Sequence, residues 1–258
     1  MVSAYHRALS GDFSDSAGEP EAQLLWRSMA FAAGMDVKPL TPEALPDTPH
    51  LLSSLTCLQE IRAASISLGA RNTQPWLDKH RRCHEPSIPR STCALALSEA
   101  WHALGSMPDE TLLLRLTEVE RSARAEGFAE LVVEAAALRA LTCARMDLTE
   151  ATRIARRASR MSRTEGMPQL EYLANITLAA TRRLNGEPHL ATRIIGAIRR
   201  VAPPLWQGWL AWEMMMAGVP PEGDHPLSVQ LNRWLEARSQ GDRSLDDSIA
   251  TLAGSPPA

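Results

Sequence analysis

Arginine is the residue type whose spacing most directly suggests a binding site in this sequence. Three arginines in the segment 148–164 recur at intervals of four and three residues, which places them on one stripe of a helix. A fourth follows forty residues after the first, and two more extend the set. Guanidinium groups bind carboxylates and phosphates through paired hydrogen bonds. The candidate binding residues are Arg153, Arg157, Arg160, Arg193, Arg199 and Arg200.

The charge distribution leaves two interpretations of these arginines open. The segment 139–200 has twelve arginines and five acidic residues, a net charge of +7, whereas residues 1–60 have a net charge of −5. The arginines could grip an acidic peptide, a terminal carboxylate or a phosphate. Alternatively, they form a solvated helix face that pairs with the acidic N-terminal region. No aromatic residue interleaves with them, so stacking on a single-stranded nucleic acid is disfavoured.

A second group of residues has the chemistry of zinc ligands. His80, Cys83 and His84 lie close together, and Cys93 follows nine residues later. The spacing matches no common structural zinc pattern, and adjacent ligands at 83 and 84 need an unusual loop geometry. A polar loop with a single thiol is the preferred interpretation, so neither a metal nor another cofactor is predicted.

The remaining sequence motifs favour a protein that is not an enzyme. The phosphate-binding, dinucleotide-binding, zinc-protease and serine-hydrolase motifs do not occur. The four cysteines form no C-x-x-C pair, which indicates reduced thiols. Residues 1–13 contain no apolar signal segment, and no run approaches about 18 apolar residues. We therefore expect a cytoplasmic protein. Its net charge of −3 provides no general attraction to membranes.

Hydrophobic periodicity predicts an all-α chain with short turns. The four prolines within 36–50 exclude a single helix there, and the polar segment 71–90 is expected to be irregular. Between the later helices, glycines or prolines are placed to end or begin a helix. The expected helices are 21–34, 51–70, 91–106, 109–126, 128–145, 148–164, 168–185, 187–202 and 204–217, followed by 226–239.

An internal repeat is the strongest signal in the chain. The tetrapeptide Ala-Thr-Arg-Ile at 151–154 recurs at 191–194, and a second match has an offset of 39 residues. The apolar positions of the two copies lie on one helix face, so each copy should bury the same face, Ile194 as well as Ile154. The matched positions are Ala151, Ile154, Ala155, Ala158 and Met161 with Ala191, Ile194, Ile195, Ile198 and Val201.

The turns of this repeat resemble those of the tetratricopeptide family. The segment 145–151 (RMDLTEA) is similar to the Gly-Asp-Leu-x-x-Ala-type turn that opens a helix in that family, and 184–191 (LNGEPHLA) takes its place one unit later. The units span 39–40 residues rather than about 34, which resembles the sensor regions of large bacterial transcription regulators. The resemblance covers about 110 residues. It implies a short solenoid in which the helix at 148–164 lines a concave groove, so that its arginines face a ligand.

These observations predict antiparallel helical hairpins stacked as a short tetratricopeptide-like solenoid. A loose tail at 1–20 precedes an N-terminal helical segment at 21–106; the repeats occupy 107–217, and 218–258 forms a C-terminal cap. Trp206, Trp209 and Trp212 form a broad apolar face, either covered by the helix at 226–239 or exposed to a partner.

The expected function is protein recognition in the concave groove, in a bacterial signalling or regulatory assembly. The partner would be another protein or peptide, and acidic groups on it would match the arginines. The alternative is a regulatory module that senses a small ligand and influences transcription. No convincing recognition helix is visible, so DNA binding would need a partner chain. The sequence does not reveal the oligomeric state.

Overall fold

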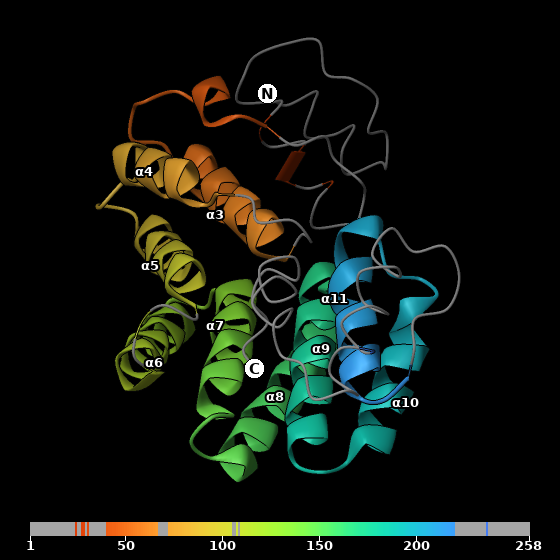
Figure 1. The fold of residues 1–258 in the computed structure, drawn as a ribbon. Helices are drawn as coiled ribbons and strands as arrows, with labels where there is room; N and C mark the ends of the chain where they lie inside the picture. Colours follow the sequence, from red (N-terminus) through yellow and green to blue (C-terminus); the bar gives the residue numbers. More distant parts are fainter. Residues whose placement is uncertain are drawn as a thin grey trace.

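The computed structural model describes residues 40–66, 72–104, 107 and 109–219, together with positions 24, 27, 28, 30 and 236. Within these residues all regular structure is helical and no strand occurs, which confirms the all-α prediction (Figure 1). The expected tail, the helix at 226–239 and most of 21–34 lie outside the described residues. The α-helices are α3 (Leu51–Ile66), α4 (Gln74–Cys83), α5 (Pro89–Ala103), α6 (Asp109–Ala125), α7 (Ala129–Cys143), α8 (Leu148–Thr164), α9 (Pro168–Leu184), α10 (Pro188–Arg199) and α11 (Pro204–Met216), and η1 (Pro42–Ala44) is a 3-10 helix.

The helix boundaries follow local chemistry that the sequence displays. Gly127, Gly166 and Gly186 follow α6, α8 and α9 with φ angles of 74°, 66° and 75°, a left-handed conformation that glycine adopts without strain. Asp147 caps α8, because its side chain accepts a hydrogen bond of 3.0 Å from the Glu150 amide. The expected breaks between helices are therefore where the structure has them.

One helix, α4, was not expected from the sequence. Its segment was expected to be irregular because it is polar and contains a proline, but Pro75 lies in the first turn, where a helix tolerates it. Trp76, Leu77, His80 and Cys83 are buried on one side of the helix. This buried face, rather than the average polarity of the segment, determines the local structure.

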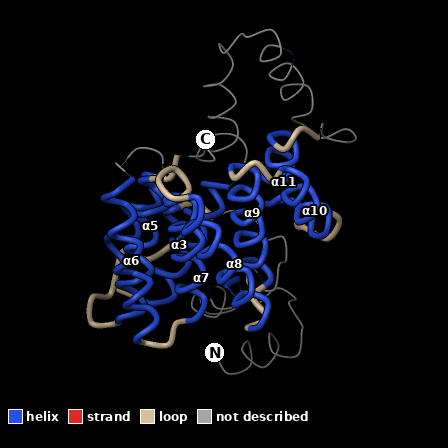
Figure 2. Tube along the Cα trace, turned by 90° about the horizontal axis from the view of Figure 1, so that it is seen from below, coloured by secondary structure: helices blue, strands red, loops and turns tan. Residues whose placement is uncertain are grey.

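From α5 onward, helices contact their neighbours in the chain, and some alternate helices also contact one another. Each helix contacts the next along the chain, and α7 also contacts α5 and α9, while α9 also contacts α11. The helices α5, α7, α9 and α11 therefore form a row. Helix α3 packs against α5 and α11, so it lies across this row (Figure 1). Seen from below, α6 lies near one end of the molecule and α10 near the other (Figure 2).

Small side chains allow the close packing of the helices around α8. Ala155 and Ala158 of α8 are buried against Ala136 and Ala140 of α7 and Ala174 of α9. With only a Cβ at each position, the helix axes can approach closely while the larger Ile154 fills the remaining space. This burial agrees with the face predicted from the repeat.

The second copy of the repeat buries less of its face than the sequence predicted. Ala191 and Ile195 of α10 are fully buried, whereas Ile194 and Ile198 are only partly buried and Val201 is 73% exposed. The prediction that Ile194 is buried as deeply as Ile154 (2% exposed) is therefore wrong. Within the described residues, this side of α10 lies next to α8 and α9 and is only partly covered by them.

A buried ion pair fixes α3 to the row of helices. Arg62 of α3 donates two hydrogen bonds to Glu134 of α7, from Nε to Oε1 at 2.7 Å and from Nη2 to Oε2 at 2.5 Å. The indole Nε1 of Trp101 in α5 donates to the same Oε1 at 2.7 Å. Glu134 has no solvent exposure, so these donors replace its hydration. One carboxylate therefore joins three helices.

We expect Glu134→Leu to lower the free energy of unfolding by about 3–5 kcal/mol, because the buried guanidinium of Arg62 loses this carboxylate. The double variant Arg62→Met/Glu134→Leu should regain part of this loss, since an apolar pair replaces the ion pair, while the buried indole N–H of Trp101 still lacks this acceptor. Urea denaturation measures both effects. As a control, Glu118→Ala removes an exposed ion pair with Arg121 and should change the free energy by less than about 1 kcal/mol. Similar stability of Glu134→Leu and the wild-type protein would contradict the proposed role of the pair.

Candidate functional site

The six candidate arginines differ in their surroundings. Arg153 pairs with Glu150 of its own helix, with both nitrogen–oxygen distances at 2.6 Å. Arg157 pairs with Glu120 of α6, and the backbone carbonyl of Arg199 accepts a hydrogen bond of 3.1 Å from Gln207. Three of the six have no ion-pair partner within the described residues. These three are Arg160, Arg193 and Arg200.

Helices α8 and α10 lie outside the row that α3 crosses. The row consists of α5, α7, α9 and α11, whereas the arginines 153, 157 and 193 project from α8 and α10. Helix α3 covers one face of this row, because it contacts α5 and α11 and because its Arg62 pairs with Glu134 of α7. The described partners of Arg153 and Arg157 are on α8 and α6, so pairing with the N-terminal region does not account for them.

An open groove lies between α8 and α10, with α9 below it. Its volume is about 460 Å³. The hydroxyl of Ser159 donates a hydrogen bond of 2.7 Å to the Asn175 side-chain oxygen there, which holds α8 to α9. Apolar side chains and two guanidinium groups line the rest, and one of these, Arg163, is 3.4 Å from Glu171. We call this site the α8–α10 groove; its main lining residues are Leu178, Ile194, Ala197, Ile198, Arg163 and Arg193.

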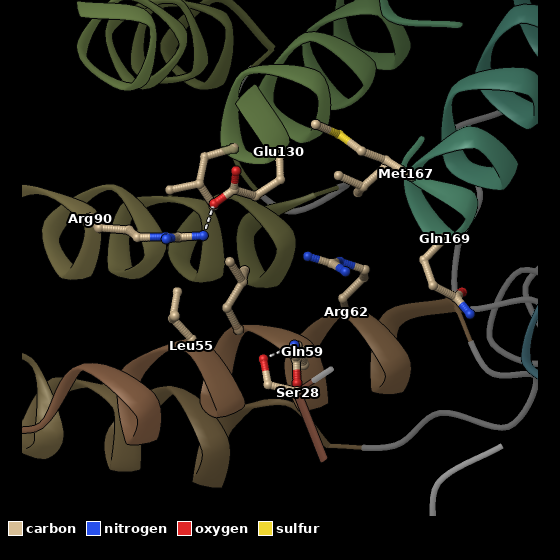
Figure 3. A pocket seen from close by; sticks show the side chains of 11 residues that line it. Ser28, Leu55, Gln59, Arg62, Arg90, Glu130, Met167 and Gln169 are labelled. Atoms are coloured by element: carbon tan, nitrogen blue, oxygen red, sulfur yellow. Dashed lines mark hydrogen bonds and ion pairs between the residues drawn. The ribbon is translucent and has the colours of Figure 1, made fainter. Parts of the chain in front are cut away.

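A smaller inner cavity lies where α3 meets α5, α7 and the start of α9 (Figure 3). Its volume is about 150 Å³. Arg90 pairs with Glu130 at its rim and also lies over the Phe128 ring, 5.6 Å from the centroid. Arg62 and Gln59 enter from α3. The cavity combines apolar walls with charged groups that already have partners.

The potential zinc ligands do not converge in the structure. His80 is buried between two hydroxyl groups, with 2.6 Å from Nε2 to Ser54 Oγ and 2.8 Å from Nδ1 to Ser98 Oγ. The sulfur of Cys83 lies 3.7 Å from the sulfur of Cys57. His84 instead lies at the surface, 3.3 Å from the Thr92 hydroxyl, and Cys93 is buried on α5. In the described part of the chain, no group of three or more potential ligands could hold a metal ion.

The chemistry of His80 is that of a buried neutral imidazole. Burial lowers its pKa from 6.5 to about 3, and the nearby His84 contributes further to the shift. The ring therefore stays uncharged and links α4 to α3 and α5 through the two serines. It lines neither the α8–α10 groove nor the inner cavity. The arrangement braces three helices rather than presenting a base to solvent.

The three tryptophans of α11 are buried. Trp209 packs edge-on against Trp101 of α5 with 6.5 Å between ring centroids, and Trp206 lies 6.1 Å from the Tyr172 ring of α9. Trp206 also donates a hydrogen bond to Gln169. Helices α5 and α9 thus cover this face within the described residues, and the expected covering helix at 226–239 lies outside them. The face offers no open binding surface.

Comparison with known proteins finds no matching family model, no similar curated protein and no similar solved structure. None of the described helices has the length and apolarity needed to cross a membrane. The geometry of the chain itself is therefore the basis of the functional argument.

Sequence reasoning missed the features that bring residues of different helices together. The α8–α10 groove is formed by residues of three helices together, which no local pattern encodes. The pairing of Arg157 with Glu120 joins positions 37 residues apart. The surplus of arginine within 139–200 was the available signal, but it did not show which guanidinium groups converge.

The depressed pKa of His80 predicts a loss of stability in acid. The unfolded chain binds a proton near pH 6.5, whereas the folded imidazole binds one only near pH 3, so the free energy of unfolding should fall between these values as pH decreases. One proton corresponds to a slope of about 1.4 kcal/mol per pH unit. Urea denaturation at several pH values should show a slope smaller by this amount in His80→Gln. The exposed His189→Gln variant should keep the wild-type slope, and an unchanged slope in His80→Gln would contradict this assignment.

Proposed function

We propose that this chain is a non-enzymatic protein-binding module with a regulatory role, whose helical hairpins form a short solenoid of the tetratricopeptide type. The partner binds in the α8–α10 groove. The repeated tetrapeptide at 151–154 and 191–194, the short helix connections and the contacts between alternate helices support the solenoid. The groove lies beside α8, the helix that the tetratricopeptide resemblance expects to line the concave groove, whereas α3 packs on the row of α5, α7, α9 and α11.

The observation that carries the proposal is the unequal burial of matched positions in the two repeats. Ile154 and Ala158 of α8 are each 2% exposed, whereas the matching Ile194 and Ile198 of α10 remain partly exposed beside the groove. An apolar face that the first copy buries is thus left open in the second. Such a face is typical of a surface that receives an apolar segment of a partner.

The charges at the groove indicate the chemistry of the partner. Arg193 is exposed at the groove and has no ion-pair partner in the described residues. Arg163 lies at the other side, on α8, in a long contact with Glu171. An amphipathic segment with apolar side chains toward Ile194 and Ile198 and acidic groups toward the two arginines would match both features.

We expect the double variant Ile194→Asp/Ile198→Asp to lose partner binding while it keeps the wild-type fold, because both side chains are only partly buried. The test is an affinity capture from nuclease-treated native lysate with identification by mass spectrometry. Leu114→Asp is the matched control, since Leu114 is an exposed apolar residue of α6 away from the groove. Proteins captured by wild type and control but lost with the groove variant would support the proposal. The proposal fails if the groove variant captures the same proteins, or if the wild-type chain captures none.

A small-ligand-sensing module linked to transcription control is the second candidate, and the inner cavity favours it. Two guanidinium groups, Arg62 and Arg90, border this cavity. Its 150 Å³ is below the roughly 300–1,000 Å³ typical of pockets for drug-sized ligands, so only a ligand of a few heavy atoms would fit. A thermal-shift screen of small carboxylic acids tests this candidate. A ligand that stabilises the wild-type protein but not Arg90→Gln would favour it, and no stabilisation by any acid would remove it.

A further inference from the structure

A cluster of arginines surrounds one buried carboxylate on the α6 side of α8. Glu120 of α6 is 3% exposed, and three guanidinium groups from three helices converge on it. Arg124 Nη2 lies 2.6 Å from Oε1, and Arg139 Nη1 of α7 lies 2.7 Å from Oε2. Arg157 of α8 pairs with Oε1 as well. We call these four residues the Glu120 cluster.

The charges of the Glu120 cluster do not balance. Three guanidinium groups face one carboxylate, which leaves a net charge of +2. The neighbouring Arg153–Glu150 pair adds no net charge, and Arg153 holds the pKa of Glu150 below its usual value with help from Arg139 and Arg157. Within the described residues, the ion pairs of the cluster thus leave the surplus uncompensated.

The hydrogen-bonding capacity of the cluster is also incomplete. Within the described residues, the buried Nε of Arg139 has no hydrogen-bond acceptor, and the buried Oε2 of Glu120 accepts no hydrogen bond, although Arg139 Nη1 lies 2.7 Å from it. Arg124 and Arg157 lie at the outer edge, with 52% and 39% of their side chains exposed. A buried donor without an acceptor destabilises a fold, so the cluster retains a donor that a bound anion could satisfy.

We propose that the Glu120 cluster binds a phosphate monoester on a partner protein. The group is a tetrahedral oxyanion with nearly two negative charges, which matches the surplus of +2. Guanidinium groups bind such oxyanions through paired hydrogen bonds, and the three arginines converge from three helices. Glu120 acts as a positioning residue, because it holds the guanidinium groups together against their mutual repulsion.

A phosphorylated protein fits this site better than a nucleic acid does. Within the described residues, the ion pairs of the three arginines are all with one carboxylate, and no aromatic ring among them offers a stacking platform for a base. The cluster lies on the α6 side of α8, while the α8–α10 groove lies on the α10 side. Phosphate binding at the Glu120 cluster therefore does not depend on partner binding in that groove.

The first experiment measures the binding of inorganic phosphate to the full chain by calorimetry, at constant ionic strength set with sodium chloride. Saturable binding is expected, and Arg157→Gln should weaken it about tenfold or more, since a charge-assisted contact is lost. Arg160→Gln is the matched control, because it removes an arginine of the same helix that has no ion-pair partner in the described residues; its affinity should stay within about twofold of wild type. Equal affinity of Arg157→Gln and wild type, or no binding to wild type, overturns the proposal.

Glu120→Gln separates a binding site from a merely structural cluster. This variant should melt at a lower temperature in chloride, because three guanidinium groups then repel one another, and phosphate should restore more of its melting temperature than chloride of equal ionic strength does. No greater effect of phosphate than of chloride contradicts the proposal. If Glu120→Gln does not fold, Arg124→Gln/Arg157→Gln provides the test, since both side chains are partly exposed and phosphate binding should be abolished.

The last experiment identifies the source of the anion with a phosphopeptide, a glutamate peptide and an oligonucleotide. A short peptide with one phosphoserine should bind at least about tenfold more tightly than the same peptide with glutamate, since the phosphate carries the larger charge. Equal affinity for the two peptides overturns the assignment to phosphate in favour of a carboxylate. Binding of a single-stranded oligonucleotide without binding of the phosphopeptide overturns the assignment to a protein partner.

Discussion

The burial of Glu134 is the constraint on which the arrangement of the described helices depends. A carboxylate without solvent contact is stable in a protein interior only when donors replace its hydration, and here Arg62 and Trp101 supply them. These donors come from α3 and α5, so α3 can cross the row of helices in one register only. The Arg183–Glu213 pair, with distances of 2.9 and 3.0 Å, fixes α9 relative to α11 in the same way. Both pairs fix positions that apolar packing alone would leave adjustable.

Much of the local structure could be predicted because its causes lie within a few residues along the chain. The glycines after α6, α8 and α9, the Asp147 cap and the buried alanines of α8 follow from short patterns. Helix α4 was not expected because the segment 71–90 is polar and contains prolines, although Pro75 lies in the first turn, where a proline removes no hydrogen bond. The tetratricopeptide-like stacking itself remains a proposal that the repeat and the packing support.

The candidate sites could not be predicted to the same extent, because they depend on which distant residues meet. Arg62 pairs with a residue 72 positions away, and Arg157 with one 37 positions away. With 27 basic and 30 acidic residues in the chain, spacing along the sequence does not select these pairs. The partial exposure of Ile194 has a similar origin, since the groove beside it is formed by α8, α9 and α10 together. Matched sequences therefore have unlike surroundings.

Helix α8 separates the two proposed binding surfaces, and their physical characters differ. On the α6 side, binding would depend on a surplus of charge, which added salt screens. On the α10 side, the contact of apolar side chains depends mainly on buried area and is less sensitive to salt. A helix with its side chains is about 10–12 Å wide, so one partner with a phosphorylated residue and an apolar segment could reach both. Joint binding would then raise the effective concentration at the second site, and salt would weaken it without abolishing the apolar contribution.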